Sequence, residues 1–152
     1  MNFKSVSVSV IVPVYNSDKF VKECLDSILN QNFETFEVLV SDDASTDKTR
    51  DILKKYECIN NLKIFYQPHN LGITQNCNFL LERVKGKYVC FFAGDDIMLP
   101  GKIRKQFEFM EVNSNYSFSY HPVEIFNSES GRKILNTNEN PKYAIKDVKS
   151  LI

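Results

Sequence analysis

The sequence predicts an α/β fold with a mostly parallel sheet flanked by helices. Segments dense in valine, isoleucine and aromatic residues alternate with segments whose apolar residues recur at helical spacing. Loops rich in Asn, Asp, Ser and Gly lie between these segments. A strand-helix alternation repeated along the chain is typical of a doubly wound domain, whose parallel sheet is covered by helices.

The first predicted strand spans residues 6–15 because valine and isoleucine dominate it, and Pro13 should lie at its end, where no ladder donor is needed. The Asn-Ser-Asp run at residues 16–18 signals a helix start, with Ser17 as the expected N-cap. Apolar residues between 20 and 29 follow at helical spacing. They predict an amphipathic helix packed on the sheet.

A second strand is predicted over residues 36–40, followed by a polar loop over residues 41–47. Ser45 or Thr46 is expected to cap the next helix. The helix itself carries Ile52, Leu53 and Tyr56.

Residues 62–66 predict the third strand, and the turn-rich residues 67–72 a loop. A third helix is expected over about residues 73–84, ended by the Lys-Gly-Lys sequence at 85–87. Its inner face should carry Ile73, Cys77, Leu80, Leu81 and Val84.

Residues 88–92 predict a fourth strand, buried on both faces, since the run is bulky and uncharged. Pro100 should open a fourth helix, with Ile103, Phe107 and Met110 inward. Further strands are expected over residues 116–120 and 123–126, then a loop or weak hairpin to residue 142. A helix is expected to begin within residues 143–152.

Composition limits the function classes. The chain has 152 residues, 19 basic and 19 acidic, so bulk charge does not favour a nucleic-acid partner. Its four cysteines are scattered without a Cys-x-x-Cys pair, which argues against zinc and for reduced core thiols. With no apolar run of transmembrane length and no signal peptide, we expect a cytoplasmic domain, membrane-associated only through a longer parent chain.

The sequence holds neither a Gly-x-Gly-x-x-Gly after the first strand nor a P-loop anywhere. Instead, Gly94 ends the fourth strand and two adjacent carboxylates follow, Asp95 and Asp96. Ligands bind outside the carboxyl ends of strands in open α/β sheets. Adjacent carboxylates there suit Mg²⁺ or Mn²⁺, which prefer oxygen ligands and often take substrate phosphates as well. The alternative is a solvated turn.

Side chains from three strand ends should meet at one rim of the sheet. Tyr15 could stack on a base, Asp43 could accept a pyrimidine N–H, and Asp96 could hold a cation that neutralises a pyrophosphate. A nucleotide diphosphate fits these groups. The alternatives are that Tyr15 is core packing and that Asp42 and Asp43 cap a loop.

Four segments together resemble family 2 glycosyltransferases, which have the GT-A fold. They are residues 10–16 (VIVPVYN), 40–47 (VSDDASTD), 70–78 (NLGITQNCN) and 94–96 (GDD). Each falls at a predicted strand-to-helix junction, and the resemblance runs from about residue 7 to about residue 120.

The resemblance implies a nucleotide-sugar donor, usually a uridine diphosphate (UDP) sugar, and inversion at the anomeric carbon. It implies that Tyr15 stacks on the base, that Asp43 binds its N–H, that Asp95 holds the ribose or sugar, and that Asp96, with Asp95, binds Mn²⁺ or Mg²⁺. The full set of implied donor contacts is Pro13, Val14, Tyr15, Asp43, Asn70, Gly72, Asn76 and Asp95.

Two departures from the family pattern matter. Cys77 stands where many relatives carry Arg. The family's catalytic base, an Asp or Glu that deprotonates the acceptor, lies further along than this chain extends, and neither Glu139 nor Asp147 has a matching context. We therefore expect residues 1–152 to form one nucleotide-sugar-binding domain that lacks the acceptor part, as in a truncated enzyme.

Three other readings compete with an active enzyme. A phospho-receiver module would need its acidic pair after the first strand, and a nucleotidyltransferase a glycine-rich loop there; neither is present. A non-catalytic donor-binding module remains open. The acceptor, whether a glycan, a lipid-linked sugar or another group, is unassigned, and exposed apolar surface would favour a homo-oligomer.

Overall fold

A computed structural model of the chain describes residues 5–136. The chain divides into two compact units, residues 1–113 and residues 114–152. The first holds the sheet and the helices, and the described part of the second holds a hairpin. Each unit is considered by itself.

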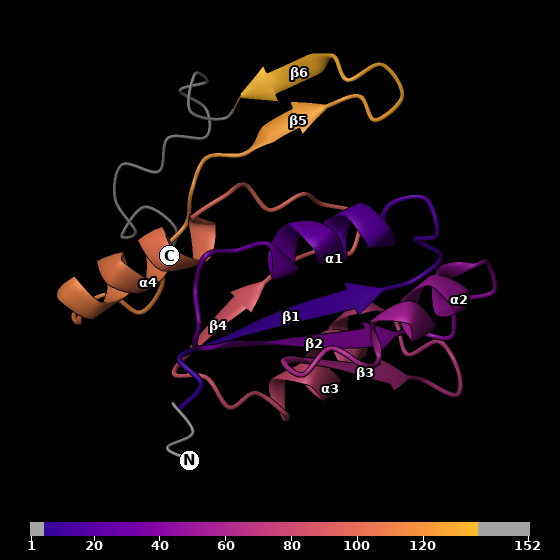
Figure 1. The fold of residues 1–152 in the computed structure, drawn as a ribbon, viewed down its shortest axis with the longest axis horizontal. Coiled ribbons are helices and arrows are strands. Elements are labelled where there is room, and N and C mark those ends of the chain that lie inside the picture. Colours follow the sequence, from indigo (N-terminus) through magenta and orange to yellow (C-terminus); the bar gives the residue numbers. More distant parts are fainter. Residues whose placement is uncertain (1–4, 137–152) are drawn as a thin grey trace. The chain divides into compact units, whose positions relative to one another are not determined.

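The first unit is built on a four-stranded sheet in the order β3-β2-β1-β4 (Figure 1). The strands are β1 (Val8–Val14), β2 (Phe36–Asp42), β3 (Leu62–Tyr66) and β4 (Tyr88–Phe91). All three neighbouring pairs are parallel. The predicted parallel α/β sheet is therefore confirmed.

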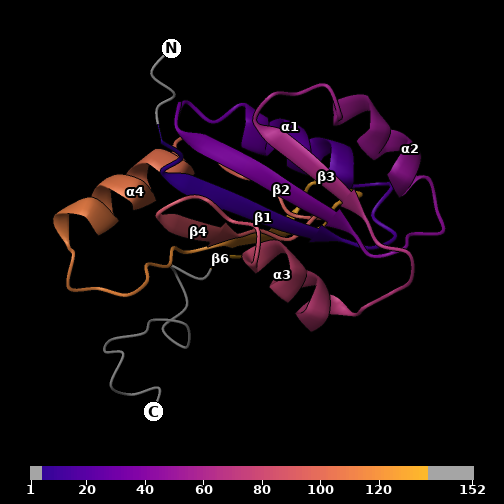
Figure 2. The same ribbon diagram turned by 90° about the horizontal axis from the view of Figure 1, so that it is seen from below.

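Helices cover both faces of this sheet (Figure 2). One face carries α1 (Val21–Leu29), α2 (Thr49–Leu53) with the 3₁₀ segment η1 (Lys54–Tyr56), and α4 (Lys102–Val112). The other face carries α3 (Ile73–Leu81). Between α1 and η1, the Tyr56 hydroxyl donates a 2.7 Å hydrogen bond to Oδ1 of Asp26.

The alternation of side chains along β1 explains this double covering. Val10 and Val12 are fully buried and belong to the same cluster as Leu25 of α1. Ile11, between them, is fully buried in the opposite cluster with Leu80 of α3. A strand that is apolar on both faces therefore requires helices on both faces.

Two strand predictions need correction. Residues 41 and 42 are not loop: β2 continues through Asp42, which pairs with Val14 and Tyr66. The strand β4 is not buried on both faces, since all four of its residues are only partly buried or exposed, and Phe91 is 60% exposed. Within the described residues β4 pairs with β1 alone, at the end of the sheet.

The predicted helix caps are also wrong. Ser17 is not the N-cap of α1: its backbone oxygen accepts bonds from the amides of Phe20 and Val21, and its hydroxyl donates to the Tyr15 carbonyl. Ser45 does not cap α2, because its hydroxyl accepts the Asn16 amide 2.9 Å away. The Ser17 hydroxyl therefore bonds within its own loop, and the Ser45 hydroxyl joins two loops.

Thr46, the other predicted cap of α2, donates its amide to Asn16, and its hydroxyl also lies within hydrogen-bond distance of Asn16 Oδ1. Pro100 precedes Gly101, the left-handed N-cap of α4 at φ 78°, and so does not open that helix. Ile73 opens α3 but is 67% exposed, contrary to its predicted inner face. The inward positions of Ile103, Phe107 and Met110 are confirmed.

The described part of the second unit is an antiparallel hairpin of β5 (Glu124–Phe126) and β6 (Lys133–Asn136). It confirms the strand predicted over residues 123–126 and the weak hairpin after it. Residues 116–120, predicted as a strand, form none. The helix expected within residues 143–152 lies outside the described residues. In the part of the chain that is described, no helix has the length and apolarity needed to cross a membrane.

Candidate functional site

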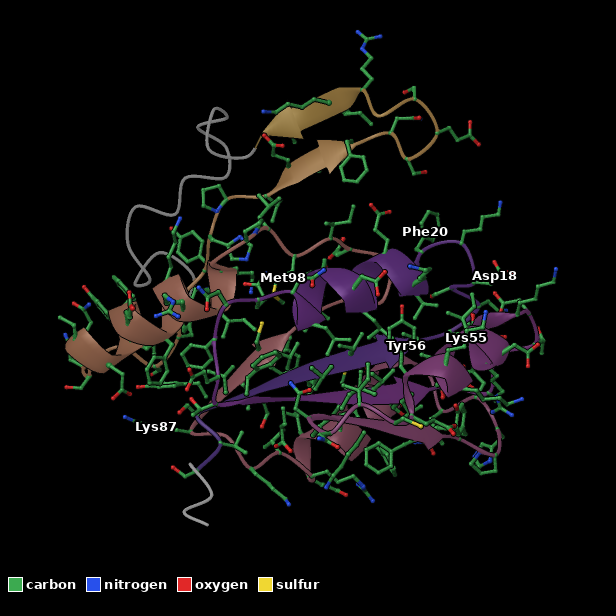
Figure 3. The ribbon with its side chains drawn as sticks, in the orientation of Figure 1. Asp18, Phe20, Lys55, Tyr56, Lys87 and Met98 are labelled. Atoms are coloured by element: carbon green, nitrogen blue, oxygen red, sulfur yellow. The ribbon has the colours of Figure 1, made fainter. Side chains whose placement is uncertain are left out.

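The carboxyl ends of the strands bring the predicted site residues to one edge of the sheet. Val14, Asp42 and Tyr66 stand side by side in register at the ends of β1, β2 and β3. Asp18 lies toward this edge, whereas Lys87 lies at the opposite one (Figure 3). Because parallel strands end together, three loops leave the sheet here.

Gly94 brings the fourth loop to the same edge. A Cβ at this position would lie 2.3 Å from Cγ1 of Val14 and 3.3 Å from the Pro13 carbonyl oxygen. Only a residue without a side chain allows so close an approach. The acidic pair that follows is thereby held beside the end of β1.

The carboxylates of Asp95 and Asp96 are exposed on this turn, which is closed by a hydrogen bond from the Asp96 amide to the Ala93 carbonyl. Partial burial, and then the charge of Asp95, raise the pKa of the Asp96 carboxyl. Below the turn, burial and the two carboxylates raise the pKa of the Cys24 thiol to about 12. The pair is thus a concentration of negative charge that a cation would relieve.

The donor set fits Mg²⁺ or Mn²⁺ shared with a substrate. In residues 5–136 no three His, Cys, Asp or Glu side chains gather to hold a metal by themselves. Magnesium commonly takes one or two carboxylates and completes its octahedron with waters and substrate phosphates. Asp95 and Asp96 would supply the protein's share of such a set.

Asp43 ties the end of β2 to the loop that follows β3. Its side chain is 3% exposed. Oδ1 accepts the Leu71 amide at 2.7 Å and Oδ2 accepts the Gly72 amide at 2.9 Å. Its own amide donates to the Val14 carbonyl. An ionised carboxylate has about four lone-pair sites, so Asp43 retains acceptor capacity for a ligand N–H.

Two other predicted residues shape this loop. Asn70 is exposed and its Oδ1 accepts the Gly72 amide at 3.0 Å. Gly72 has φ 80°, which favours glycine, and no atom lies within 4 Å of where a Cβ would be. Its conformation, not lack of space, therefore selects glycine.

Asn76 lies beneath the rim. It is 1% exposed, its Nδ2 donates to the Ser41 carbonyl at 3.0 Å, and its Oδ1 has no hydrogen-bond partner among the described residues. Val14 is likewise buried, and its backbone oxygen is taken by the Asp43 amide. These two residues support the rim from below.

Tyr15 is 49% exposed at the end of β1, which rules out ordinary core packing for its ring. The next residue is fixed: the Asn16 amide donates to Ser45 Oγ, and Asn16 Oδ1 accepts the Thr46 amide. Anchored backbone and an exposed ring suit stacking on a flat ligand.

Asp42 and Arg50 form an ion pair that sequence reasoning missed. Asp42 is fully buried, and its Oδ2 lies 2.6 Å from Nε of Arg50. The prediction for Asp42 was a loop cap, and its Oδ2 does accept the Ser45 amide at 3.3 Å. Nothing in the sequence marks Arg50 as a partner, because the pair depends on how α2 packs against β2.

Cys77, the departure from the family pattern, lies half-buried on α3. Burial raises the pKa of its thiol, which keeps the group neutral. The chain thus presents no charge at this position.

Comparisons with known proteins agree with this architecture. The model of the family described as "Glycosyl transferase family 2" matches residues 9–150. TuaG from Bacillus subtilis, named as a candidate glycosyltransferase of teichuronic acid biosynthesis, is 36% identical over 138 residues, which are 90% of this chain and 55% of TuaG. An uncharacterized glycosyltransferase from Methanocaldococcus jannaschii is 34% identical over 93% of this chain and 49% of its own. The chain thus spans about half the length of these two relatives.

Solved structures give the same picture. Staphylococcus aureus TarS (residues 1–349 of that protein), determined with UDP-GlcNAc, superposes with a TM-score of 0.67 and 36% identity, over 72% of this chain and 32% of TarS. The mannosyltransferase PcManGT from Pyrobaculum calidifontis, determined with GDP-Man and Mn²⁺, gives a TM-score of 0.57 and 28% identity, over 63% of this chain and 29% of its own.

Proposed function

Because the chain belongs to glycosyl transferase family 2, we propose that its rim binds a UDP-sugar and that the protein transfers the sugar, with inversion, to an acceptor. The observation that carries this proposal is the meeting of three unlike groups at one edge. Tyr15 presents an exposed ring, Asp43 a fixed acceptor, and Asp95 and Asp96 a negative charge. These groups suit a base, its N–H, and a pyrophosphate with its cation, in that order.

Each group has a distinct proposed role. Tyr15 stacks on the uracil, and Asp43 accepts its N–H while holding the loop at Leu71 and Gly72. Pro13 and Val14 shape the base pocket through their backbone. Asp95 binds the ribose or the sugar. Asn70 and Gly72 form the wall facing the base, and Asn76 supports it from the core.

Asp96, with Asp95, would hold the divalent cation. The raised pKa of the Asp96 carboxyl marks the cost of leaving this charge uncompensated. A bound Mn²⁺ or Mg²⁺ stabilises the charge that develops on a leaving diphosphate. Because Gly94 holds the two carboxylates beside β1, they would orient the diphosphate end of the donor toward that strand.

Inversion requires a base on the acceptor hydroxyl, and we assign none within this chain. The acceptor class, a glycan, a lipid-linked sugar or another group, stays open. We further propose that this domain acts in the cytoplasm. A second candidate is a donor-binding module without turnover, favoured because every role assigned above concerns the donor or its cation.

Calorimetric titration of UDP into the chain with Mn²⁺ tests the proposal. We expect metal-dependent binding that Asp96→Ala abolishes, because the substitution removes a cation ligand. Asp51→Ala is the matched control, since Asp51 is an exposed aspartate on α2 whose ion pair within residues 5–136 is with Lys54. Absence of UDP binding to the folded wild-type chain would contradict the proposal. Release of UDP from UDP-GlcNAc would distinguish the enzyme from the binding module.

A further inference from the structure

The ion pair between Asp42 and Arg50 at the end of β2 is part of a larger network of hydrogen bonds. Asp42 is fully buried, with Oδ2 bound to Nε of Arg50 at 2.6 Å and Oδ1 without a partner among the described residues. A buried carboxylate is costly unless it is paired. Arg50, on α2, supplies the only cation that the described residues place against it.

Arg50 also reaches the strand on the far side of β2. Its Nη2 donates to the Gln67 carbonyl at 2.8 Å, and its guanidinium lies 5.7 Å from the centroid of the Tyr66 ring. Gln67 is buried, donating its amide to the Asp42 carbonyl and its Nε2 to Ser41 Oγ at 2.9 Å. One planar guanidinium thus joins the ends of β2 and β3.

The loop over residues 67–72 is therefore held at both ends by two consecutive aspartates. Asp42 holds its beginning at Gln67, through Arg50. Asp43 holds its end directly, at the amides of Leu71 and Gly72. The same loop carries Asn70, whose Oδ1 accepts the Gly72 amide at 3.0 Å.

We propose that Arg50 is a positioning residue of the donor site, which acts through Asp42 and Gln67 to fix the 67–72 loop and the Asp43 carboxylate. This inference rests on the proposed donor binding at the same rim. Among the described residues, the side-chain hydrogen bonds and the ring contact of Arg50 go to Asp42, Gln67 and Tyr66, none of which is a predicted donor contact. Its effect on the nucleotide passes through the two strand ends that it joins.

The test compares Arg50→Met and Arg50→Lys with the wild-type chain. Methionine removes the charge and both hydrogen bonds while keeping the apolar stem. Lysine keeps a charge near Asp42 but cannot make both bonds with one planar fork. Lys54→Met is the matched control, because it removes an exposed ion pair with Asp51 one turn further along.

Two readouts are needed: UDP affinity with Mn²⁺, and hydrogen exchange of the Leu71 and Gly72 amides without ligand. Arg50→Met should weaken UDP binding by about tenfold or more, the size of a lost charge-assisted hydrogen bond. Both loop amides should exchange faster, while the Val12 amide in β1 stays protected. Arg50→Lys should be intermediate, and Lys54→Met unchanged.

Unchanged UDP affinity together with unchanged exchange of the loop amides in Arg50→Met would overturn the inference. It would also be overturned if the amides of β1 exchanged faster by the same factor as the loop amides. If Arg50→Met does not fold, Arg50→Lys decides: wild-type affinity and exchange would overturn the inference, and weaker binding with a loosened loop would support it. Failure of the wild-type chain to bind UDP would instead refute the proposed function, whatever the exchange of the loop.

Discussion

Two Asp-Asp pairs lie at the carboxyl ends of parallel strands, yet they meet opposite environments. Asp42 and Asp43 are buried and receive hydrogen bonds from Arg50, Ser45, Leu71 and Gly72. Asp95 and Asp96 are exposed and face each other's charge. The first pair therefore holds the strand ends and the 67–72 loop together, with acceptor capacity left at Asp43 for a ligand N–H, and the second pair is exposed to a cation. A sequence pattern alone does not separate these roles.

The raised pKa of the Asp96 carboxyl predicts how stability depends on pH without metal. The folded chain binds this proton more tightly than the unfolded chain does. As pH rises above the ordinary pKa of 3.8 and through the raised pKa of the folded chain, ionisation of Asp96 therefore lowers the free energy of unfolding. Asp96→Asn should therefore be the more stable protein near neutral pH, and the difference should disappear below about pH 3.8. Urea unfolding across this range measures it.

Asp26 provides a control of opposite sign. Hydrogen bonds from Lys22 and then Tyr56 lower the pKa of its carboxyl below the ordinary 3.8. Its stabilising effect is present above that value and is lost as pH falls through the lowered one. Asp26→Asn should thus be less stable than wild type at neutral pH. If Asp26→Asn and Asp96→Asn shifted stability in the same direction, the electrostatic explanation would be wrong.

At the level of elements, the edge of the sheet opposite the site has its own polar cluster. Glu37 of β2 is 8% exposed, and its Oε1 accepts the Ser9 hydroxyl at 2.7 Å and the Lys85 amide at 2.8 Å. The Gly86 amide donates to Ser9 Oγ. A Cβ on Gly86 would lie 2.5 Å from the Ser9 nitrogen. The cluster fixes the connection from α3 to β4, and so the start of the strand that carries the acidic pair.

Glu37→Ala should destabilise the chain by about 1–3 kcal/mol, since it leaves buried donors without their acceptor. Urea unfolding gives the value. Glu23→Ala, on the exposed side of α1, should change stability by less than about 0.5 kcal/mol. UDP affinity of folded Glu37→Ala should stay close to wild type, because the cluster lies at the far edge. A loss of affinity without loss of stability would contradict this separation of the two edges.

On the scale of the whole molecule, the core belongs to the first unit. Every buried apolar residue of both clusters lies between Val8 and Met110. The described second unit is a short hairpin whose two strands bury little: Ile125, Phe126 and Ile134 are 46%, 45% and 65% exposed. A sheet covered on both faces is the part expected to fold independently.

A chain ending at Asn113 should therefore fold, with a cooperative urea transition and a midpoint close to that of the full chain. Circular dichroism and urea unfolding check this. It should also keep UDP binding, since all proposed donor contacts precede residue 97. A non-cooperative transition would show that residues after 113 complete the core.

Local sequence was enough to predict the order of strands and helices through α4, because apolar residues recur with periods of about 2 residues in strands and about 3.6 residues in helices. It also predicted that Tyr15, Asp43 and the acidic pair share one edge, since parallel strands end together. The end of β2 and the caps were mispredicted because Asp42 pairs with Arg50 of α2, the Ser45 hydroxyl accepts the Asn16 amide from another loop, and the Ser17 hydroxyl donates to the nearby Tyr15 carbonyl. Only tertiary packing decided which aspartates are buried, that β4 stands at the end of the described sheet, and that Arg50 joins β2 to β3. Each of these depends on contacts between residues that no local pattern relates.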